Sequence, residues 1–186
     1  PPGRLPITES TPLRNPHWRY SQDKIACEQL LVDAHRATGF PATIVRPSHT
    51  YDRTSIPTMG GWTDIARMRR GAPVVVHGDG SSLWVLTHHA DFAHAFVGLL
   101  GHPQAIGDAF HITSDELLTW DGIYRDLARA AGVDDPHLVH VPSERIAAAD
   151  AELGASLLGD KSHSVIFDNS KVTRLVPDYV AARPFW

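Results

Sequence analysis

Hydrophobic and polar positions alternate along this chain with two different periods, and a helical period dominates before residue 40. Asn15 and Pro16 suit the cap and the first position of a helix. Beyond them, apolar residues recur at three- and four-residue spacing: Cys27, Leu30, Leu31 and Ala34. Gly39 is typical of a helix end, so the pattern predicts a helix over 16–38, preceded by an extended, proline-rich loop over 1–16.

The next apolar run is short and β-branched. Ala42-Thr43-Ile44-Val45 predicts a buried strand that Arg46-Pro47 stops. A helix followed by a buried strand is typical of a parallel α/β sheet.

The remaining pattern alternates short strands with helices. It predicts helices over 62–70, 90–100 and 119–131, strands over 74–76, 83–86, 109–112 and 138–141, and helical pieces near 143–158 and 170–176. In the helix over 90–100 we expect the apolar residues to face the core: Phe92, Ala93, Phe96, Val97 and Leu100. The fold class predicted is α/β, with part of a parallel sheet followed by a smaller mixed α/β region.

Composition narrows the classes of function. The chain has 186 residues, 42% of them hydrophobic and 20% charged, as in an ordinary globular protein. The net charge of −4 gives no reason to expect nucleic acid as a partner, and no stretch is long and apolar enough for a membrane span or signal peptide. Cys27 is the single cysteine, which excludes a disulfide within the chain and favours a reducing, cytoplasmic compartment.

Tyr20 and Lys24 are the leading candidates for chemistry. They stand four residues apart near the start of the first predicted helix, so both side chains leave one face. An ammonium group beside a phenol stabilises the phenolate, which makes a tyrosine usable for proton transfer near neutral pH. The alternative is a surface tyrosine beside a surface lysine.

A glycine-rich phosphate-binding turn is missing from the sequence. Gly78-Asp79-Gly80 is the nearest candidate, but it lacks a third glycine and leads into a predicted strand. It is better interpreted as a turn between two strands.

Several segments together resemble the extended short-chain dehydrogenase/reductase family, in its NAD-dependent epimerase/dehydratase branch. The resemblance covers nearly all of the chain and rests on these segments: 5–13, Tyr20-xxx-Lys24 with Glu28, 39–47, 74–80, 87–93, 107–112 and 168–171. The family's N-terminal half, with its glycine-rich fingerprint and catalytic Ser or Thr, has no counterpart here. The resemblance therefore implies the C-terminal portion of a Rossmann-like protein of about 300 residues.

The resemblance also implies roles for individual residues. Tyr20 would be the acid/base toward a substrate hydroxyl or ketone, and Lys24 would bind the nicotinamide ribose. Pro47 and Ser48 match positions that approach the nicotinamide, and His49 matches a substrate-contacting position. The implied cofactor is NAD or NADP, with NAD favoured, and the implied substrate is a small molecule such as a sugar nucleotide.

Organisation and assembly follow from the same resemblance. Residues 1–57 would end the dinucleotide-binding domain and 58–186 would mainly form the substrate-binding region. The helix that carries Cys27, Leu30 and Leu31 matches the family's usual homodimer surface.

Two positions depart from the family pattern. Asp52 stands where a glycine is usual, and Trp84 stands where sugar-nucleotide epimerases carry an arginine that binds phosphate. A neutral indole cannot pair with a diphosphate as a guanidinium does. Trp62 and Trp84 could stack on a sugar, as a substrate-binding role for Trp84 would require, or both could be core residues.

Three other hypotheses about function compete with that of an oxidoreductase. A metal site would use the cluster of His88, His89, Asp91 and His94, but these positions drift around a helix, and Asp91 suits a structural acid near the helix start. No metal site is therefore predicted. A hydrolase would need Ser48 and His49 to converge, whereas neighbours on an extended segment point apart. The remaining rival is a non-catalytic binding or scaffold protein of the same fold.

Overall fold

The computed structural model describes residues 3–185, so Pro1, Pro2 and Trp186 of the predicted terminal segments lie outside the described residues. In chain order the elements are α1 (Arg19–Thr38), β1 (Ile44–Pro47), β2 (His49–Tyr51), α2 (Trp62–Met68), β3 (Val74–His77), β4 (Leu83–Trp84), β5 (Leu86–His88), α3 (His89–Leu99), η1 (Pro103–Ala105), β6 (Ala109–Ile112), β7 (Leu118–Thr119), α4 (Trp120–Ala130), β8 (Leu138–Val141), α5 (Ser143–Ala149), α6 (Ala151–Ser156), η2 (Leu157–Lys161) and α7 (Ser170–Leu175). The protein is α/β, as the pattern predicts.

Three of the four strand pairs are parallel. β1 pairs with β6, β2 with β5 and β3 with β8, while β4 and β7 are antiparallel. β1 and β2 follow one another with only Ser48 between them, so the chain passes from one parallel pair to the next at that residue. This step places Ser48 and its neighbours at the carboxyl end of β1, where ligands bind in parallel α/β sheets.

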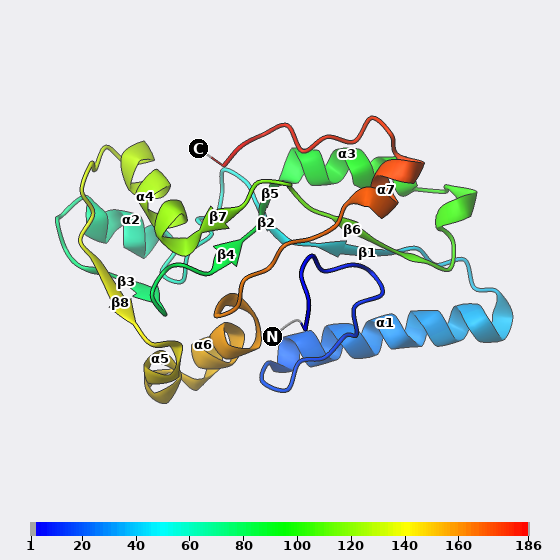
Figure 1. Ribbon diagram of the computed structural model, residues 1–186, viewed down its shortest axis with the longest axis horizontal. Coiled ribbons are helices and arrows are strands. Elements are labelled where there is room, and N and C mark those ends of the chain that lie inside the picture. Colours follow the sequence, from blue (N-terminus) through cyan, green and yellow to red (C-terminus); the bar gives the residue numbers. More distant parts are fainter. Residues whose placement is uncertain (1–2, 186) are drawn as a thin grey trace.

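Two hydrophobic clusters hold these strands. One gathers around β1 and β6 and includes Phe110, Ile112 and Val172, with α3 and α7 on one side of the strands and α1 on the other (Figure 1). The second gathers around β3, β4 and the helices α2 and α4, where Trp84 and Trp120 pack with their ring centroids 5.2 Å apart. The boundary predicted near residue 57 stays a prediction, although β6 from the later segment pairs with β1 from the earlier one.

The start of the first helix was predicted wrongly. Asn15 does not cap α1, which begins at Arg19; its side-chain Oδ1 instead accepts hydrogen bonds from the backbone N–H groups of His17 and Trp18, at 3.1 and 3.0 Å. Asparagine readily closes such a turn onto the backbone two and three residues ahead, which competes with helix formation. The predicted end is confirmed, since Gly39 has φ 72° and its N–H donates to His35 O.

The inward face of α3 was predicted wrongly except at Phe92, which is partly buried and packs against the cluster around β1 and β6. Ala95 and Leu99 are buried there, whereas Phe96, Val97 and Leu100 are 38%, 63% and 62% exposed. Ala93 is exposed as well. A helix with apolar residues on more than one side does not reveal from sequence alone which side meets the sheet.

Smaller differences concern strand ends. The strand predicted over 42–45 runs from Ile44 to Pro47, so Arg46-Pro47 belongs to it rather than stopping it. The strand predicted over 83–86 is divided at Val85 into β4 and β5, which pair with different partners. Thr119 caps α4 as expected, its hydroxyl accepting from Gly122 N at 3.0 Å.

Candidate functional site

A pocket of about 500 Å³ opens beside the start of α1, and we call it the Tyr20 pocket. Its lining comes from α1, the β1–β2 step, β4 and the end of η2: Trp18, Tyr20, Ser21, Pro47, Ser48, His49, Thr50, Trp84, Val85, Asp160, Lys161, Val165 and Phe167. Five of the six site residues proposed from the sequence are therefore in one place, and they come from three separate segments.

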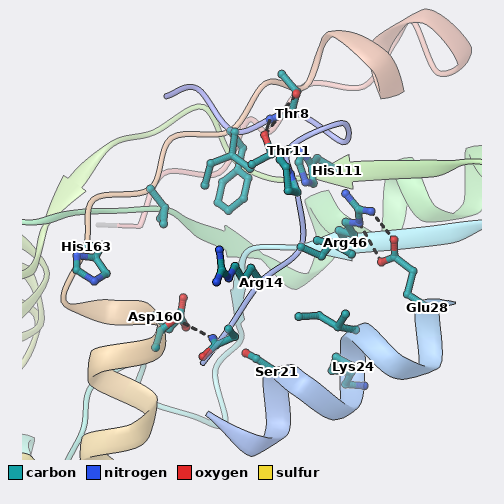
Figure 2. A pocket seen from close by; sticks show the side chains of 18 of the residues that line it. Thr8, Thr11, Arg14, Ser21, Lys24, Glu28, Arg46, His111, Asp160 and His163 are labelled. Atoms are coloured by element: carbon teal, nitrogen blue, oxygen red, sulfur yellow. Dashed lines mark hydrogen bonds and ion pairs between the residues drawn. The ribbon is translucent and has the colours of Figure 1, made fainter. Parts of the chain in front are cut away.

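Lys24 is the sixth of these residues, and it lines an adjacent pocket instead of the Tyr20 pocket. Its Nζ is 5.5 Å from the centre of the Tyr20 ring, as expected for residues one helical turn apart. It lines a neighbouring pocket of about 590 Å³, which shares four lining residues with the Tyr20 pocket: Ser21, Asp160, Val165 and Phe167. Figure 2 shows Ser21 and Lys24 on α1, with Asp160 and His163 on the segment opposite. Tyr20 and Lys24 thus stand side by side at the junction of two cavities.

Tyr20 is held from one side and open on the other. Its ring lies 4.9 Å from that of Trp18, centre to centre, and the residue is 56% exposed. The phenol is therefore positioned by an aromatic neighbour and remains accessible to a ligand.

Ser48 and His49 face different partners. Ser48 Oγ lies 2.6 Å from Thr87 Oγ1, and His49 Nδ1 accepts from Trp84 Nε1 at 3.3 Å. Neither side chain bonds to the other, in keeping with the argument from the sequence against a Ser-His hydrolase pair. Both still line the Tyr20 pocket.

His49 is a neutral group at neutral pH. Burial, with a smaller contribution from the Lys161 charge, lowers the pKa of His49 to about 4. The bond from the Trp84 indole independently requires that Nδ1 carry no proton. His49 can therefore donate one hydrogen bond through Nε2 but brings no charge to the pocket.

The two tryptophans differ. Trp84 is 4% exposed and belongs to the core, although its edge reaches the Tyr20 pocket. Trp62 is 58% exposed and lies outside the pocket lining, so its interpretation as a core residue is wrong. Asp52 accepts two hydrogen bonds from Thr54, through its N–H and its hydroxyl, and does not line the Tyr20 pocket either.

The residues of the histidine cluster have other partners. His88 Nδ1 accepts from Ala90 N at 3.2 Å, and His94 lies 3.3 Å from Asp178. Asp91 is buried and forms an ion pair with Arg183 at the first turn of α3, the structural position expected for it. Within residues 3–185, no group of three or more His, Cys, Asp or Glu side chains is arranged to hold a metal ion.

Sequence reasoning missed the far wall of the Tyr20 pocket. Asp160 and Lys161 come from the end of η2, far from α1 in sequence. The only signal for them was that Lys161 is one of three lysines in the chain. Its position could not be read without knowing how α5 and α6 fold back toward α1.

A family model and many known proteins resemble this chain. The model of the NAD dependent epimerase/dehydratase family matches residues 1–113. The 2'-dehydrokanamycin reductase of Streptomyces kanamyceticus is 31% identical over 186 residues, covering 96% of this chain and 51% of the reductase. The chloroplast stem-loop binding protein of 41 kDa b from Arabidopsis thaliana is 30% identical over 117 residues, covering 63% of this chain and 30% of that protein.

Among solved structures, the UDP-glucuronic acid 4-epimerase of Bacillus cereus, in complex with UDP-glucuronic acid and NAD, gives a TM-score of 0.76 at 19% identity. It covers 99% of this chain and 54% of the epimerase. The chain therefore spans about half the length, or less, of the proteins it resembles. In residues 3–185 no helix is both long and apolar enough to cross a membrane.

Proposed function

Because this chain belongs to the NAD dependent epimerase/dehydratase family, we propose that it forms part of an NAD(P)-dependent oxidoreductase. The reaction would take place at a hydroxyl or ketone of a sugar or sugar nucleotide. The main support for the proposal is that one pocket is lined by Tyr20, Ser48 and His49. Lys24 lies beside the Tyr20 ring.

Tyr20 is the proposed acid/base. Its exposed phenol can donate a proton to a ketone oxygen or accept one from a hydroxyl placed in the Tyr20 pocket. The Lys24 ammonium lies 5.5 Å from the centre of the Tyr20 ring, one helical turn away. His49 is neutral and can orient a substrate oxygen through Nε2 without competing for the proton.

We propose that the nicotinamide end of a dinucleotide binds at Pro47, Ser48 and Lys24. Pro47 and Ser48 lie where β1 ends, which is the edge of a parallel sheet that binds such ligands. We propose that Lys24, which lines the adjoining pocket, binds the ribose hydroxyls. When bound, the nicotinamide would supply hydride transfer, and this chain would supply proton transfer and orientation.

The pyrophosphate end has no counterpart in this chain, since a glycine-rich turn before a helix is missing from its sequence. We propose that a further N-terminal segment provides it, and that this segment is required for activity. NAD is favoured over NADP because the Bacillus cereus epimerase was solved with NAD.

The substrate class rests on the relatives. The Streptomyces protein is a reductase of 2'-dehydrokanamycin, a second relative is a dTDP-4-keto-6-deoxy-D-glucose reductase of Streptomyces niveus, and the Bacillus cereus enzyme was solved with UDP-glucuronic acid. A sugar carrying a ketone or hydroxyl at the reacting carbon is the chemistry that these names share.

A non-catalytic binding protein of the same fold is the second candidate. It is favoured by the identity to the stem-loop binding protein, whereas the net charge of −4 does not favour a nucleic acid partner. The two candidates differ in whether Tyr20 and Lys24 act on a bound dinucleotide.

We also propose how the protein assembles and where it is located. Leu30 and Leu31 are 70% and 37% exposed on α1, which suits the proposed homodimer surface. We also propose a cytoplasmic location and the division into 1–57 and 58–186.

The experiment uses the complete protein, with its length established by intact mass, and titrates NAD and NADP. Tyr20→Phe should lower kcat/KM toward a keto sugar by at least about 100-fold with little change in NAD affinity. Lys24→Met should weaken NAD binding by about 10-fold. Arg19→Met is the control, because Arg19 is exposed and, among residues 3–185, forms its ion pair with Asp23, one turn on. Failure of the native protein to bind either dinucleotide would favour the binding protein instead.

A further inference from the structure

Lys161 places a positive charge in the wall of the Tyr20 pocket. Its side chain is 19% exposed, and its Nζ lies 5.0 Å from the Trp18 ring centre and 5.7 Å from the Trp84 ring centre. Cations are attracted to the faces of indole rings, so the two tryptophans hold the ammonium group at this position.

The backbone of Lys161 is fixed from behind the pocket. Its carbonyl oxygen accepts a hydrogen bond from His77 Nε2 at 3.1 Å and another from Ser82 Oγ at 3.2 Å. His77 is 1% exposed, so this support comes from the core. A change of the Lys161 side chain leaves both bonds in place, and the position is therefore suitable for substitution.

The ammonium group has hydrogen-bonding capacity to spare. It can donate three hydrogen bonds. Within residues 3–185 its recorded oxygen contact is Asp160 Oδ2, at 3.4 Å, which is long for a charged pair. The indole rings of Trp18 and Trp84 beside it carry no charge, and His49, which lines the same pocket, is neutral at neutral pH. A partly buried cation with one distant carboxylate is poorly compensated, and a negatively charged ligand would compensate it.

We propose that Lys161 binds an anionic group of the substrate, a phosphate or a carboxylate, and so selects acidic sugars in the Tyr20 pocket. The inference rests on the proposed function only in placing a sugar there. The Lys161 ammonium supplies a positive charge that the neutral indole of Trp84 cannot supply, although Lys161 is distant from Trp84 in the sequence. The same ammonium would disfavour a substrate that carries a positive charge at that point.

The test measures binding of three small sugars to the complete protein by ligand-observed NMR titration. Glucose 1-phosphate carries a phosphate, glucuronate carries a carboxylate, and glucose carries no charge. One charge-assisted hydrogen bond should make the better of the two anions bind about 10- to 100-fold more tightly than glucose. Whichever anion is preferred identifies the source of the negative charge.

Variants assign that preference to Lys161. Lys161→Met keeps the length of the apolar stem and should lower the affinity for the anion to about that for glucose. Lys161→Arg should keep it. Asp160→Asn removes the competing carboxylate and should strengthen anion binding. Lys171→Met is the matched control, because Lys171 on α7 pairs with Asp108, just before β6, and does not line the Tyr20 pocket.

Two results would overturn the inference. One is equal binding of glucose and both anions by the native protein, and the other is an anion preference that survives Lys161→Met. NAD titration of the same samples separates this failure from that of the proposed function. A Lys161→Met protein that binds NAD normally is folded, and its sugar preference then decides the role of Lys161 alone.

Discussion

The hydroxyl oxygens of Ser48 and Thr87 lie 2.6 Å apart, joining the step between β1 and β2 to the strand that pairs with β2. Thr87 is fully buried, and its Oγ1 also accepts the backbone N–H of Ser114 at 2.8 Å. The Thr87 hydroxyl therefore holds Ser48 at the edge of the Tyr20 pocket. It also accepts the buried backbone N–H of Ser114, in the loop that follows β6.

Thr87→Val should remove both interactions with little change in shape. The buried N–H of Ser114 would lose its acceptor, so we expect unfolding to become easier by about 1 to 3 kcal/mol. Urea denaturation measures this change. Thr87→Ser keeps the hydroxyl and should cost about 1 kcal/mol or less. Equal losses in the two variants would mean that packing of the methyl group matters and the hydroxyl does not.

Arg183→Met should destabilise the protein through Asp91. The Asp91 carboxylate is 3% exposed, it pairs with the Arg183 guanidinium, and it accepts Arg183 N at 3.0 Å. Loss of the guanidinium leaves a buried carboxylate with only the backbone bond, at an expected cost of about 1 to 3 kcal/mol.

Arg129→Met is the control for this pair. Arg129 is exposed and pairs with Asp126 one turn away on α4, so its loss should change the free energy of unfolding by less than about 0.5 kcal/mol. Thermal denaturation of both variants compares a pair whose carboxylate is 3% exposed with a pair whose carboxylate is 16% exposed. A smaller effect at Arg183 than at Arg129 would contradict the structural role of Asp91.

Gly154→Ala tests how α5 and α6 approach each other. A Cβ at residue 154 would lie 2.3 Å from the Cα of Ala147, a backbone atom that cannot move aside. Alanine favours a helix, yet the overlap should outweigh that gain and destabilise the protein by about 1 to 3 kcal/mol. Since η2 follows α6 directly, the anion preference tested above should weaken too.

Gly122→Ala is the matched helical substitution. The nearest atom to its Cβ is the Thr119 hydroxyl, at 3.1 Å, on a side chain rather than the backbone. We expect this variant to unfold at nearly the native urea concentration. A stable Gly154→Ala protein would show that α5 and α6 can separate without cost.

The free energy of unfolding should depend on pH in a way that reflects the titration of His49. Because its pKa is lowered from 6.5 to about 4, the unfolded chain binds a proton at pH values where the folded chain does not. Stability therefore falls as pH drops from about 6.5 toward 4, and at pH 5 the loss due to His49 should be about 1 to 2 kcal/mol.

His49→Gln removes that titration and keeps a hydrogen-bond acceptor for the Trp84 indole. Urea unfolding at pH 7.5 and pH 5 should show a smaller loss in His49→Gln than in the native protein. Buried His77 and His111 titrate in both proteins and cancel in the comparison. Identical losses would mean that His49 is protonated in the folded state.

The sequence by itself determined the α/β class, most elements and most of the candidate site. Helix ends such as Gly39 and the Thr119 cap are local, because the residue that stops or starts the helix is within a few positions of it. The pairing of Tyr20 with Lys24 is equally local, since one helical turn joins them. The resemblance to a family then gathered Pro47, Ser48 and His49 with them.

Only the tertiary structure decided which apolar face of α3 is buried and what completes the Tyr20 pocket. Phe96 and Val97 are as apolar as the residues that are buried, and the choice between faces depends on where β6 and α7 lie. Lys161 faces Trp18 across a separation of more than 140 residues, a contact that no local spacing encodes. The hydrophobic periodicity of a segment reflects the environment of that one helix or strand. The charge in a pocket depends instead on how elements distant in the sequence pack together. The position of the Lys161 ammonium near Trp84 could therefore not be predicted from the sequence.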